Sequence, residues 1–332
     1  MRLLVLGGTV FVGHAVAAEA LRRGHEVVCA ARGTNPVPEG ATLVKVDRDS
    51  DQGLTPLTGE FDAVVDVAPL SYPWVANALR DLGDRAGHWT FVSTINVYRD
   101  NATPGQTPAT GPLREPITEH ATREAILTKE NGSDLYGAIK VASENAVREA
   151  MGDRAFVVRP GLITGTGDGS DRFGYWPGRF ARGGRVLVPD VDQPMQIIDV
   201  QDLARWTVDA AEQKLAGTYD GIGPHRPLTE MLAEIAEVVG FDGETVPASG
   251  EQLTEANVNP WSGPRSLPMW LPPEYDGMKS HDATPSIEAG MPVRPFAEAV
   301  ADALAHERVL GLDRERKAGL SPTEEAEVLA NL

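Results

Sequence analysis

Short apolar runs alternate with helix-like patterns through the first half of the chain. Nearly all positions in these runs are apolar, as is typical of strands buried on both faces of a parallel sheet. A helix-like pattern at residues 11–23 ends at Gly24 and separates the first two runs. We therefore predict an α/β fold with a Rossmann-type, doubly wound parallel sheet. Its six predicted strands are residues 2–6, 26–31, 41–46, 61–67, 89–93 and 155–159.

The pattern changes after Gly161. Turn residues dominate residues 165–171, and a strand-like segment at 196–200 and a helix at 202–213 follow. One helix (228–239) and a Pro/Trp-rich stretch (259–273) come next. We predict a dinucleotide-binding domain (residues 1–163 and 194–224), a smaller C-terminal substrate-binding lobe (164–193 and 225–295) and C-terminal helices (296–332). Ser321 and Glu324 have the spacing of a capping box at the start of the last helix. Loop residues 101–116 and a helical pattern near 119–130 are expected to form a rim over the site.

Composition excludes several classes of protein. The formal net charge of −18 argues against a nucleic-acid surface, because phosphate binding requires clustered Lys and Arg. The single cysteine, Cys29, rules out an intrachain disulfide and favours a reducing compartment. No apolar run approaches the ~20 residues of a membrane span, and residues 1–6 are too short for a signal peptide. We expect a cytoplasmic protein, and the scattered histidines suggest no metal site.

A glycine-rich turn joins the first predicted strand to the first helix. Gly7 allows a tight turn, Gly13 allows close packing of helix and sheet, and the helix N-terminus offers free N–H groups to a pyrophosphate. A plain strand-to-helix turn is the alternative. The turn predicts cofactor contacts from Gly7, Thr9, Val10, Phe11, Val12 and Gly13.

The end of the second strand predicts which nicotinamide cofactor is bound. An acidic residue there would bind a ribose 2′-hydroxyl, whereas the chain has Ala31 and then Arg32, which suits a 2′-phosphate. We predict NADP(H), with NAD(H) as the alternative cofactor and a solvated charge as the alternative role of Arg32. Asp47 is expected at the adenine edge or as a loop cap. The predicted set is completed by Ala68, Pro69, Ser93, Pro160, Tyr136 and Lys140.

Thr94, Tyr136 and Lys140 form the predicted catalytic set. A tyrosine has a pKa of ~10 and is a poor base near neutrality. Lys140 follows four residues later, on the same helix face, where an ammonium would lower that pKa. Thr94 would hold the substrate oxygen while Tyr136 donates or accepts its proton. The alternative is a tyrosine and a lysine on an ordinary amphipathic helix.

These motifs resemble those of a known family. The chain is similar to the extended branch of the short-chain dehydrogenase/reductases, the NAD-dependent epimerase/dehydratase family. It is most similar to atypical members with a Gly-Gly-Thr-x-Phe-Val-Gly opening, which include chloroplast stem-loop-binding-like proteins. The resemblance implies that Thr94, Tyr136 and Lys140 are the family's triad, that Asp199 and Asp202 lie near the lobe junction, and that the protein is a homodimer. It rests on 93-Ser-Thr-Ile-Asn-Val-Tyr-98, Tyr136-Gly-Ala-Ile-Lys140, Val158-Arg-Pro160 and residues 196–203.

Three positions depart from the family pattern. Val10 replaces the middle glycine of the turn, where a Cβ close to the pyrophosphate would weaken or reposition the cofactor. Ile95 and Asn96 replace the Asp-Glu pair of 4,6-dehydratases, so this activity is not expected. Leu162 replaces an asparagine that holds nucleotide sugars in many members, which favours a simpler carbonyl substrate.

The remaining candidates concern the substrate. Aromatic side chains at residues 175–176 and 261–270 suit stacking on a ring, although packing of a proline-rich loop explains the tryptophans equally well. Arginines at 172, 179, 182 and 185 suit an anionic group, although a solvated face is the favoured interpretation. The predicted substrate contacts are Thr94, Ile95, Asn96, Tyr175, Trp176 and Arg179.

Together these features predict an NADP(H)-dependent oxidoreductase acting on a small or medium carbonyl or alcohol. An epimerase that retains its cofactor is the first alternative. A non-catalytic nucleotide- or RNA-binding protein is the second, although the net charge and the complete triad oppose it.

Overall fold

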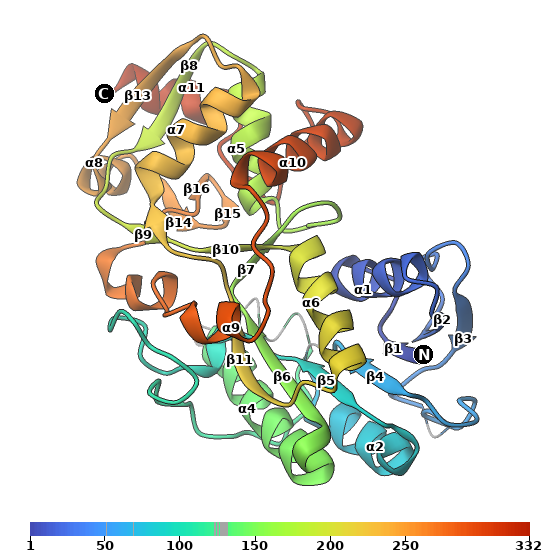
Figure 1. Ribbon diagram of the computed structural model, residues 1–332. Coiled ribbons are helices and arrows are strands. Elements are labelled where there is room, and N and C mark those ends of the chain that lie inside the picture. Colours follow the sequence, from blue (N-terminus) through green and yellow to red (C-terminus); the bar gives the residue numbers. More distant parts are fainter. Residues whose placement is uncertain (51, 69, 123, 125, 127–131) are drawn as a thin grey trace.

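Seven parallel strands form the central sheet, in the order β11-β6-β5-β4-β1-β2-β3 (Figure 1). The computed structural model describes residues 1–50, 52–68, 70–122, 124, 126 and 132–332. All six pairings within the sheet are parallel, and the strand order reverses between β1 and β4, which confirms the predicted Rossmann-type fold. The strands are β1 (Arg2–Leu6), β2 (Glu26–Ala31), β3 (Thr42–Lys45), β4 (Ala63–Asp66), β5 (Trp89–Val92), β6 (Ala155–Pro160) and β11 (Gly217–Gly221).

Helices cover both faces of this sheet. On one face α1 (Phe11–Arg22) packs against α6 (Val200–Gln213), and on the other α2 (Tyr72–Leu82) packs against α4 (Gly132–Met151). Each face has its own apolar core, because the strands are buried on both sides. The sheet and α4 together fix the positions of the predicted catalytic residues.

The six strands predicted from sequence are all present, with ends that differ by at most two residues. The seventh strand, β11, was not predicted because its sequence, Gly-Thr-Tyr-Asp-Gly, has no apolar run. It pairs with β6, and its buried Asp220 accepts a hydrogen bond from the Tyr98 hydroxyl at 2.7 Å. Half of the expected helical pattern at 119–130, and Pro69, lie outside the described residues.

A separate apolar core lies in the C-terminal lobe, at the end of the molecule opposite α2 (Figure 1). Three helices, α5 (Arg172–Ala181), α7 (Leu228–Val239) and α10 (Phe296–Leu310), pack together beside the parallel pair β8 (Arg185–Pro189) and β13 (Glu244–Ala248). The predicted capping box of Ser321 and Glu324 is confirmed at the start of α11 (Pro322–Ala330), which packs on β8. The C-terminal helices therefore contribute to the core of this lobe.

Short elements connect the lobe with the sheet domain. The pairs β7 (Leu162–Thr164) with β10 (Ile197–Asp199) and β9 (Pro194–Met195) with β12 (Arg226–Pro227) lie where the chain passes between the two cores. Further short elements are α8 (Gly250–Glu255), β14 (Asn259–Trp261), β15 (Gly263–Pro264), β16 (Ser266–Pro268), α9 (Thr284–Glu288), β17 (Ala318–Gly319) and the 3-10 turns Gly83–Arg85, Ile95–Val97, Gly152–Arg154, Pro273–Tyr275 and Gly277–Lys279.

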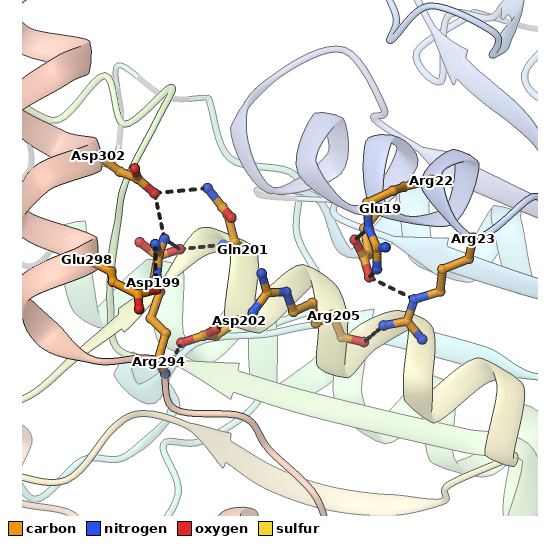
Figure 2. Close-up of polar contacts among 10 residues, drawn as sticks. All are labelled: Glu19, Arg22, Arg23, Asp199, Gln201, Asp202, Arg205, Arg294, Glu298 and Asp302. Carbon is orange, nitrogen blue, oxygen red and sulfur yellow. Dashed lines mark hydrogen bonds and ion pairs between the residues drawn. The ribbon is translucent and has the colours of Figure 1, made fainter.

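A network of charged side chains ties α10 to the start of α6 (Figure 2). The backbone N–H of Arg294 donates to Asp202 at 2.8 Å, and its guanidinium lies 2.8 Å from Asp302 and 3.6 Å from Asp199. Desolvation raises the pKa of both Asp199 and Asp202, and Arg294 opposes this shift. Asp199 and Asp202 thus lie at the lobe junction. None of the helices in the described part of the chain is long and apolar enough to cross a membrane.

Candidate active site

Two cavities meet at the carboxyl ends of the central strands. A groove of about 560 Å³ follows the glycine turn and the ends of β2, β3 and β4. A larger chamber of about 740 Å³ lies between the sheet domain and the lobe. Both cavities are lined by Val10, Phe11, Ser93, Tyr136 and Ile163. A cofactor in the groove and a substrate in the chamber would therefore meet at Tyr136.

The glycine turn fits a dinucleotide pyrophosphate. Gly7 has a φ of +98°, and a Cβ added at Gly13 would lie only 2.3 Å from the Gly7 carbonyl oxygen, so both positions require glycine. The N-cap of α1, Val10, makes no side-chain capping bond, which leaves N–H groups of the first turn available to an anion. The Val10 side chain is 57% exposed and lines both cavities. Phe11 has a φ of +39°, which is rare for a large side chain and marks local strain.

The predicted cofactor contacts in the described residues all line one or both of these cavities. Arg32 is exposed beside the groove, and no carboxylate in the described part of the chain pairs with it. Arg32 and Asp47 also line a smaller hollow of about 360 Å³, together with Lys45 and Ser50. The sequence analysis did not identify Lys45, although it directly precedes the end of the third strand. The groove set is Gly7, Thr9, Val10, Phe11, Val12, Gly13, Arg32, Asp47, Ala68, Ser93, Tyr136 and Lys140, and Pro160 lines the chamber.

Lys140 is buried below the junction of the two cavities. Its ammonium donates hydrogen bonds to the carbonyl oxygens of Ala68, at 2.7 Å, and Val92, at 2.6 Å. It lies 5.9 Å from the centre of the Tyr136 ring. Burial lowers the pKa of Lys140 to about 8, although the carboxylates of Asp66 and Glu144 oppose this shift. The lysine thus connects the ends of β4 and β5 to the tyrosine.

Tyr136 and Thr94 form a hydrogen-bonded pair at the meeting point. Burial raises the pKa of Tyr136 to about 12, and the hydrogen bond with the Thr94 side chain opposes this rise. The direction differs from the lowering expected from Lys140, because desolvation of the phenolate has the larger effect. Tyr136 therefore keeps its proton at neutral pH. Thr94 also accepts a hydrogen bond from the Asn96 N–H at 3.2 Å, which fixes its orientation.

A buried polar network supports this pair from behind. Glu144, one turn after Lys140 on α4, accepts a 2.6 Å hydrogen bond from Ser93 and binds Arg159 through two nitrogens, at 2.7 and 2.9 Å. Arg159 donates to the Tyr98 hydroxyl at 2.9 Å. The sequence analysis did not identify Glu144, although the spacing 136, 140, 144 places all three side chains on one helix face.

The structure does not bring three of the predicted substrate residues to the chamber. Tyr175 and Trp176 are almost completely buried in the core of the lobe, and the Trp176 indole donates to the Pro268 carbonyl at 3.0 Å. Arg179 is paired with Glu325 at 2.6 Å. These side chains stabilise the lobe because they lie on the inner face of α5, a helix that the sequence analysis did not predict.

Other predicted substrate residues do line the chamber. They are Thr94, Ile95 and Asn96. Trp261, one of the aromatic residues expected to stack on a ring, lies in the same wall with Met195 and Gln196. Three charged side chains that were not predicted as contacts also line the chamber: Arg114, Lys279 and Lys317. They were missed because they come from separate segments that only folding brings together. Among the described residues, no group of three or more His, Cys, Asp or Glu side chains could hold a metal ion.

The geometry of the groove and the triad agrees with the comparison with known families. The model of the NAD dependent epimerase/dehydratase family matches residues 3–220. The chain belongs to the NAD-dependent epimerase/dehydratase family. It is therefore an NAD(P)-dependent enzyme of the short-chain dehydrogenase/reductase type.

The chain is also similar to individual proteins, at low sequence identity. The 2'-dehydrokanamycin reductase of Streptomyces kanamyceticus is 28% identical over 275 residues, which cover 77% of this chain and 73% of the relative. The UDP-N-acetylglucosamine 4-epimerase of Bacillus cereus has a TM-score of 0.66 at 17% identity, covering 96% of this chain and 100% of that chain. The UDP-glucose 4-epimerase of Thermus thermophilus, solved with NAD, has a TM-score of 0.63 at 17% identity, covering 93% and 99%. At these identities the two structures show the shared fold.

Proposed function

We propose that the protein is an NADP(H)-dependent oxidoreductase that interconverts a ketone and a secondary alcohol, with Tyr136 as the proton donor and acceptor. The observation that carries this proposal is the position of Tyr136, which lines both cavities where they meet and has the Thr94 side chain beside it in the chamber wall. The similarity to a reductase from Streptomyces kanamyceticus supports the direction of carbonyl reduction.

The residues of the chain have distinct roles in this reaction. A nicotinamide bound in the groove supplies or accepts the hydride. Thr94 orients the substrate oxygen, and Tyr136, protonated at neutral pH, donates its proton to that oxygen during reduction. The Lys140 ammonium stabilises the phenolate that forms as the proton leaves. Lys140 also holds the ends of β4 and β5 in place through the Ala68 and Val92 carbonyls.

Replacement of the acid tests the proposal. Tyr136→Phe should lower kcat for ketone reduction by roughly 10²–10⁴-fold, the typical contribution of a general acid, and leave NADPH affinity nearly unchanged. Tyr219→Phe is a matched control, since Tyr219 packs against Trp206 away from both cavities. Equal turnover of Tyr136→Phe and the native protein would refute the role of Tyr136. Stoichiometric release of NADP⁺ would distinguish a reductase from an epimerase that retains its cofactor.

The preference for NADP(H) is supported by charge at the adenosine end of the groove. Arg32 and Lys45 are exposed around one hollow, and Ala31 provides no carboxylate for a ribose 2′-hydroxyl. Lys45→Met should weaken binding of NADPH and leave that of NADH unchanged, since only NADPH carries the 2′-phosphate. The double change Ala31→Asp with Arg32→Asn should reverse the preference. Fluorescence titration with both cofactors measures each effect, and an unchanged affinity ratio would exclude this role for the two cations.

Two further expectations come from the sequence: the homodimer from the family resemblance, and the cytoplasmic location from the composition. We expect a homodimer and a cytoplasmic location. Analytical ultracentrifugation would measure the first, and fractionation of cells would measure the second.

A further inference from the structure

The wall of the chamber is rich in cationic side chains, although the chain as a whole is acidic. Within the described residues, four cationic side chains line the chamber, whereas Asp168 is its single carboxylate, although the whole chain has a net charge of −18. The Asp168 oxygens accept hydrogen bonds from the backbone and the hydroxyl of Ser170, at 2.8 and 2.9 Å. The four cations are Arg114, Arg172, Lys279 and Lys317.

Arg172, at the start of α5, is a half-buried cation in this wall. Its guanidinium carbon lies 4.8 Å from the centre of the Trp261 ring, and its Nε donates to the Ser170 hydroxyl at 3.2 Å. No carboxylate in the described part of the chain forms an ion pair with it. Burial lowers the pKa of Arg172, and the nearby charge of Asp168 opposes this shift. A desolvated cation is unfavourable unless an anion compensates it.

The buried arginines Arg159 and Arg179 each have a carboxylate partner. Arg159 lies 2.7 Å from Glu144, and Arg179 lies 2.6 Å from Glu325. At Arg172 the terminal nitrogens make no hydrogen bond to any described residue, and the side chain faces a chamber large enough for a ligand. Its stacking on Trp261 holds the guanidinium plane in one orientation.

Lys279 provides a second cation in the same wall. Lys279 is 3% exposed, and its ammonium lies 3.1 Å from the Asp276 carboxylate. Burial lowers the pKa of Lys279 and Asp276 opposes the shift. Arg114 is paired with Asp134 at 2.7 Å, and the exposed Lys317 donates to the Gly169 carbonyl at 2.8 Å. Arg172 and Lys279 are therefore the two desolvated cations in this wall with the least compensation.

We propose that Arg172 and Lys279 form an anion subsite, and that the substrate is a ketone or secondary alcohol that also carries a carboxylate or phosphate group. This inference rests on the proposed function: the carbonyl end lies at Thr94 and Tyr136, and the anionic end at Arg172. A guanidinium held against Trp261 can bind two oxygens of either group. A substrate bearing ammonium groups is disfavoured, since it would face four cations.

Binding of small anionic ketones tests the subsite. The probes are 4-oxopentanoate and dihydroxyacetone phosphate, each compared with its neutral counterpart, methyl 4-oxopentanoate or dihydroxyacetone, and with the ammonium ketone 5-(dimethylamino)pentan-2-one, which is protonated at neutral pH. Binding is measured by calorimetry on the full chain saturated with NADP⁺, which fills the cofactor phosphate sites and cannot reduce the ketone. We expect at least one anionic probe to bind more tightly than its neutral counterpart and than the ammonium ketone. The tighter of the two anionic probes identifies carboxylate or phosphate as the group recognised.

Substitutions assign the effect to the subsite. Arg172→Gln should weaken binding of the anionic probe by roughly tenfold or more, the value of one charge-assisted hydrogen bond, and leave the neutral probe unchanged. Lys279→Met should act in the same direction. Arg185→Gln is the control, since Arg185 pairs with Glu244 on the surface. Equal affinity of Arg172→Gln and native protein for the anion, absence of anion binding, or preference for the ammonium ketone would each overturn the proposal.

The experiments distinguish a failure of the anion-subsite proposal from a failure of the proposed redox function. If the native protein binds no NADPH, the oxidoreductase proposal fails, and the same titrations are run without cofactor. Anion binding that depends on Arg172 would then still support the subsite, and its absence would still contradict it.

Discussion

Tyr136 and Lys140 lie one helical turn apart, and burial shifts their pKa values in opposite directions. The pKa of Tyr136 rises to about 12 and that of Lys140 falls to about 8, since in both cases the neutral form is favoured by desolvation. Tyr136 is thus protonated at neutral pH and can act as an acid. Lys140 is the group of the two that loses its proton near pH 8.

These shifts predict different pH profiles for the two directions of the reaction. Oxidation requires Tyr136 without its proton, so its rate should rise with pH and level off above about pH 8, where Lys140 loses the charge that stabilises the phenolate. Reduction requires the protonated form, which persists well above pH 9, and should instead decline above about pH 8 as Lys140 loses its charge. Profiles of kcat/KM in both directions measure this. If both profiles rose together above pH 8, another group would be the acid.

The glycine turn beside the cofactor groove has no room for a side chain at Gly13. A Cβ at this position would lie 2.3 Å from the Gly7 carbonyl oxygen, which belongs to the backbone and cannot move aside cheaply. Gly13→Ala should lower the free energy of unfolding by about 1–3 kcal/mol, as overpacking does, and abolish tight NADPH binding. Gly83→Ala is the control, because the nearest atom to its Cβ would be the Met151 sulfur at 3.8 Å. Denaturation and cofactor titration give both readouts, and native-like binding by Gly13→Ala would contradict this account.

At the scale of single elements, α4 combines catalysis and stability on one face. Tyr136 and Lys140 face the cavities, and Glu144 ends the same stripe in the buried pair with Arg159. The spacing of the three residues was visible in the sequence. Its partners Ser93, directly after β5, and Arg159, in β6, come from the sheet, so only the assembled sheet shows that Glu144 holds them.

Glu144→Gln should therefore destabilise the protein strongly. The change leaves the buried Arg159 without its anion, and breaking a buried pair from one side costs about 3–5 kcal/mol. Glu149→Gln, on an exposed position of the same helix, should change the free energy of unfolding by less than about 0.5 kcal/mol. Urea denaturation followed by circular dichroism measures both variants. Equal midpoints would mean that the pair contributes little.

The helix α5 was not predicted, for reasons of local propensity. Its ten residues include Gly174, Pro177 and Gly178, which all disfavour a helix interior. Burial of Phe173 and Phe180 in the lobe core outweighs that preference. Because the helix was missed, its buried residues were interpreted as substrate contacts, whereas Arg172 at its first position faces the chamber.

At the scale of the whole molecule, the candidate active site depends on how the sheet domain and the C-terminal lobe are joined. The chamber is lined from both sides, and the charged network of Figure 2 connects α10 with the start of α6 at their junction. Arg294 opposes the raised pKa of both Asp199 and Asp202, and Arg205 also opposes that of Asp202.

Arg294→Met should destabilise the protein at pH 7 by about 1–3 kcal/mol, since Asp199 then remains charged and buried without its cation. A carboxyl group whose pKa is raised on folding stabilises the fold below its unfolded value of about 4 and loses this contribution as pH rises through the folded value. The deficit relative to the native protein should therefore shrink as pH falls towards 4. Thermal denaturation between pH 4 and 8 measures it, with the exposed Arg308→Met as control. A deficit that is independent of pH would argue against this role for Asp199.

Local sequence determined the strands, the glycine turn and the spacing of Tyr136 and Lys140, since apolar runs, backbone freedom and helical periodicity all act over a few residues. Tertiary structure decided what depends on distant partners. It brought β11 to the sheet edge despite a polar sequence, and it placed Tyr175, Trp176 and Arg179 inside the lobe. It also raised the pKa of Tyr136, because desolvation depends on surroundings that the neighbouring sequence does not specify. The cationic wall of the chamber has the same origin, as its side chains come from four separate segments that meet only in the folded chain.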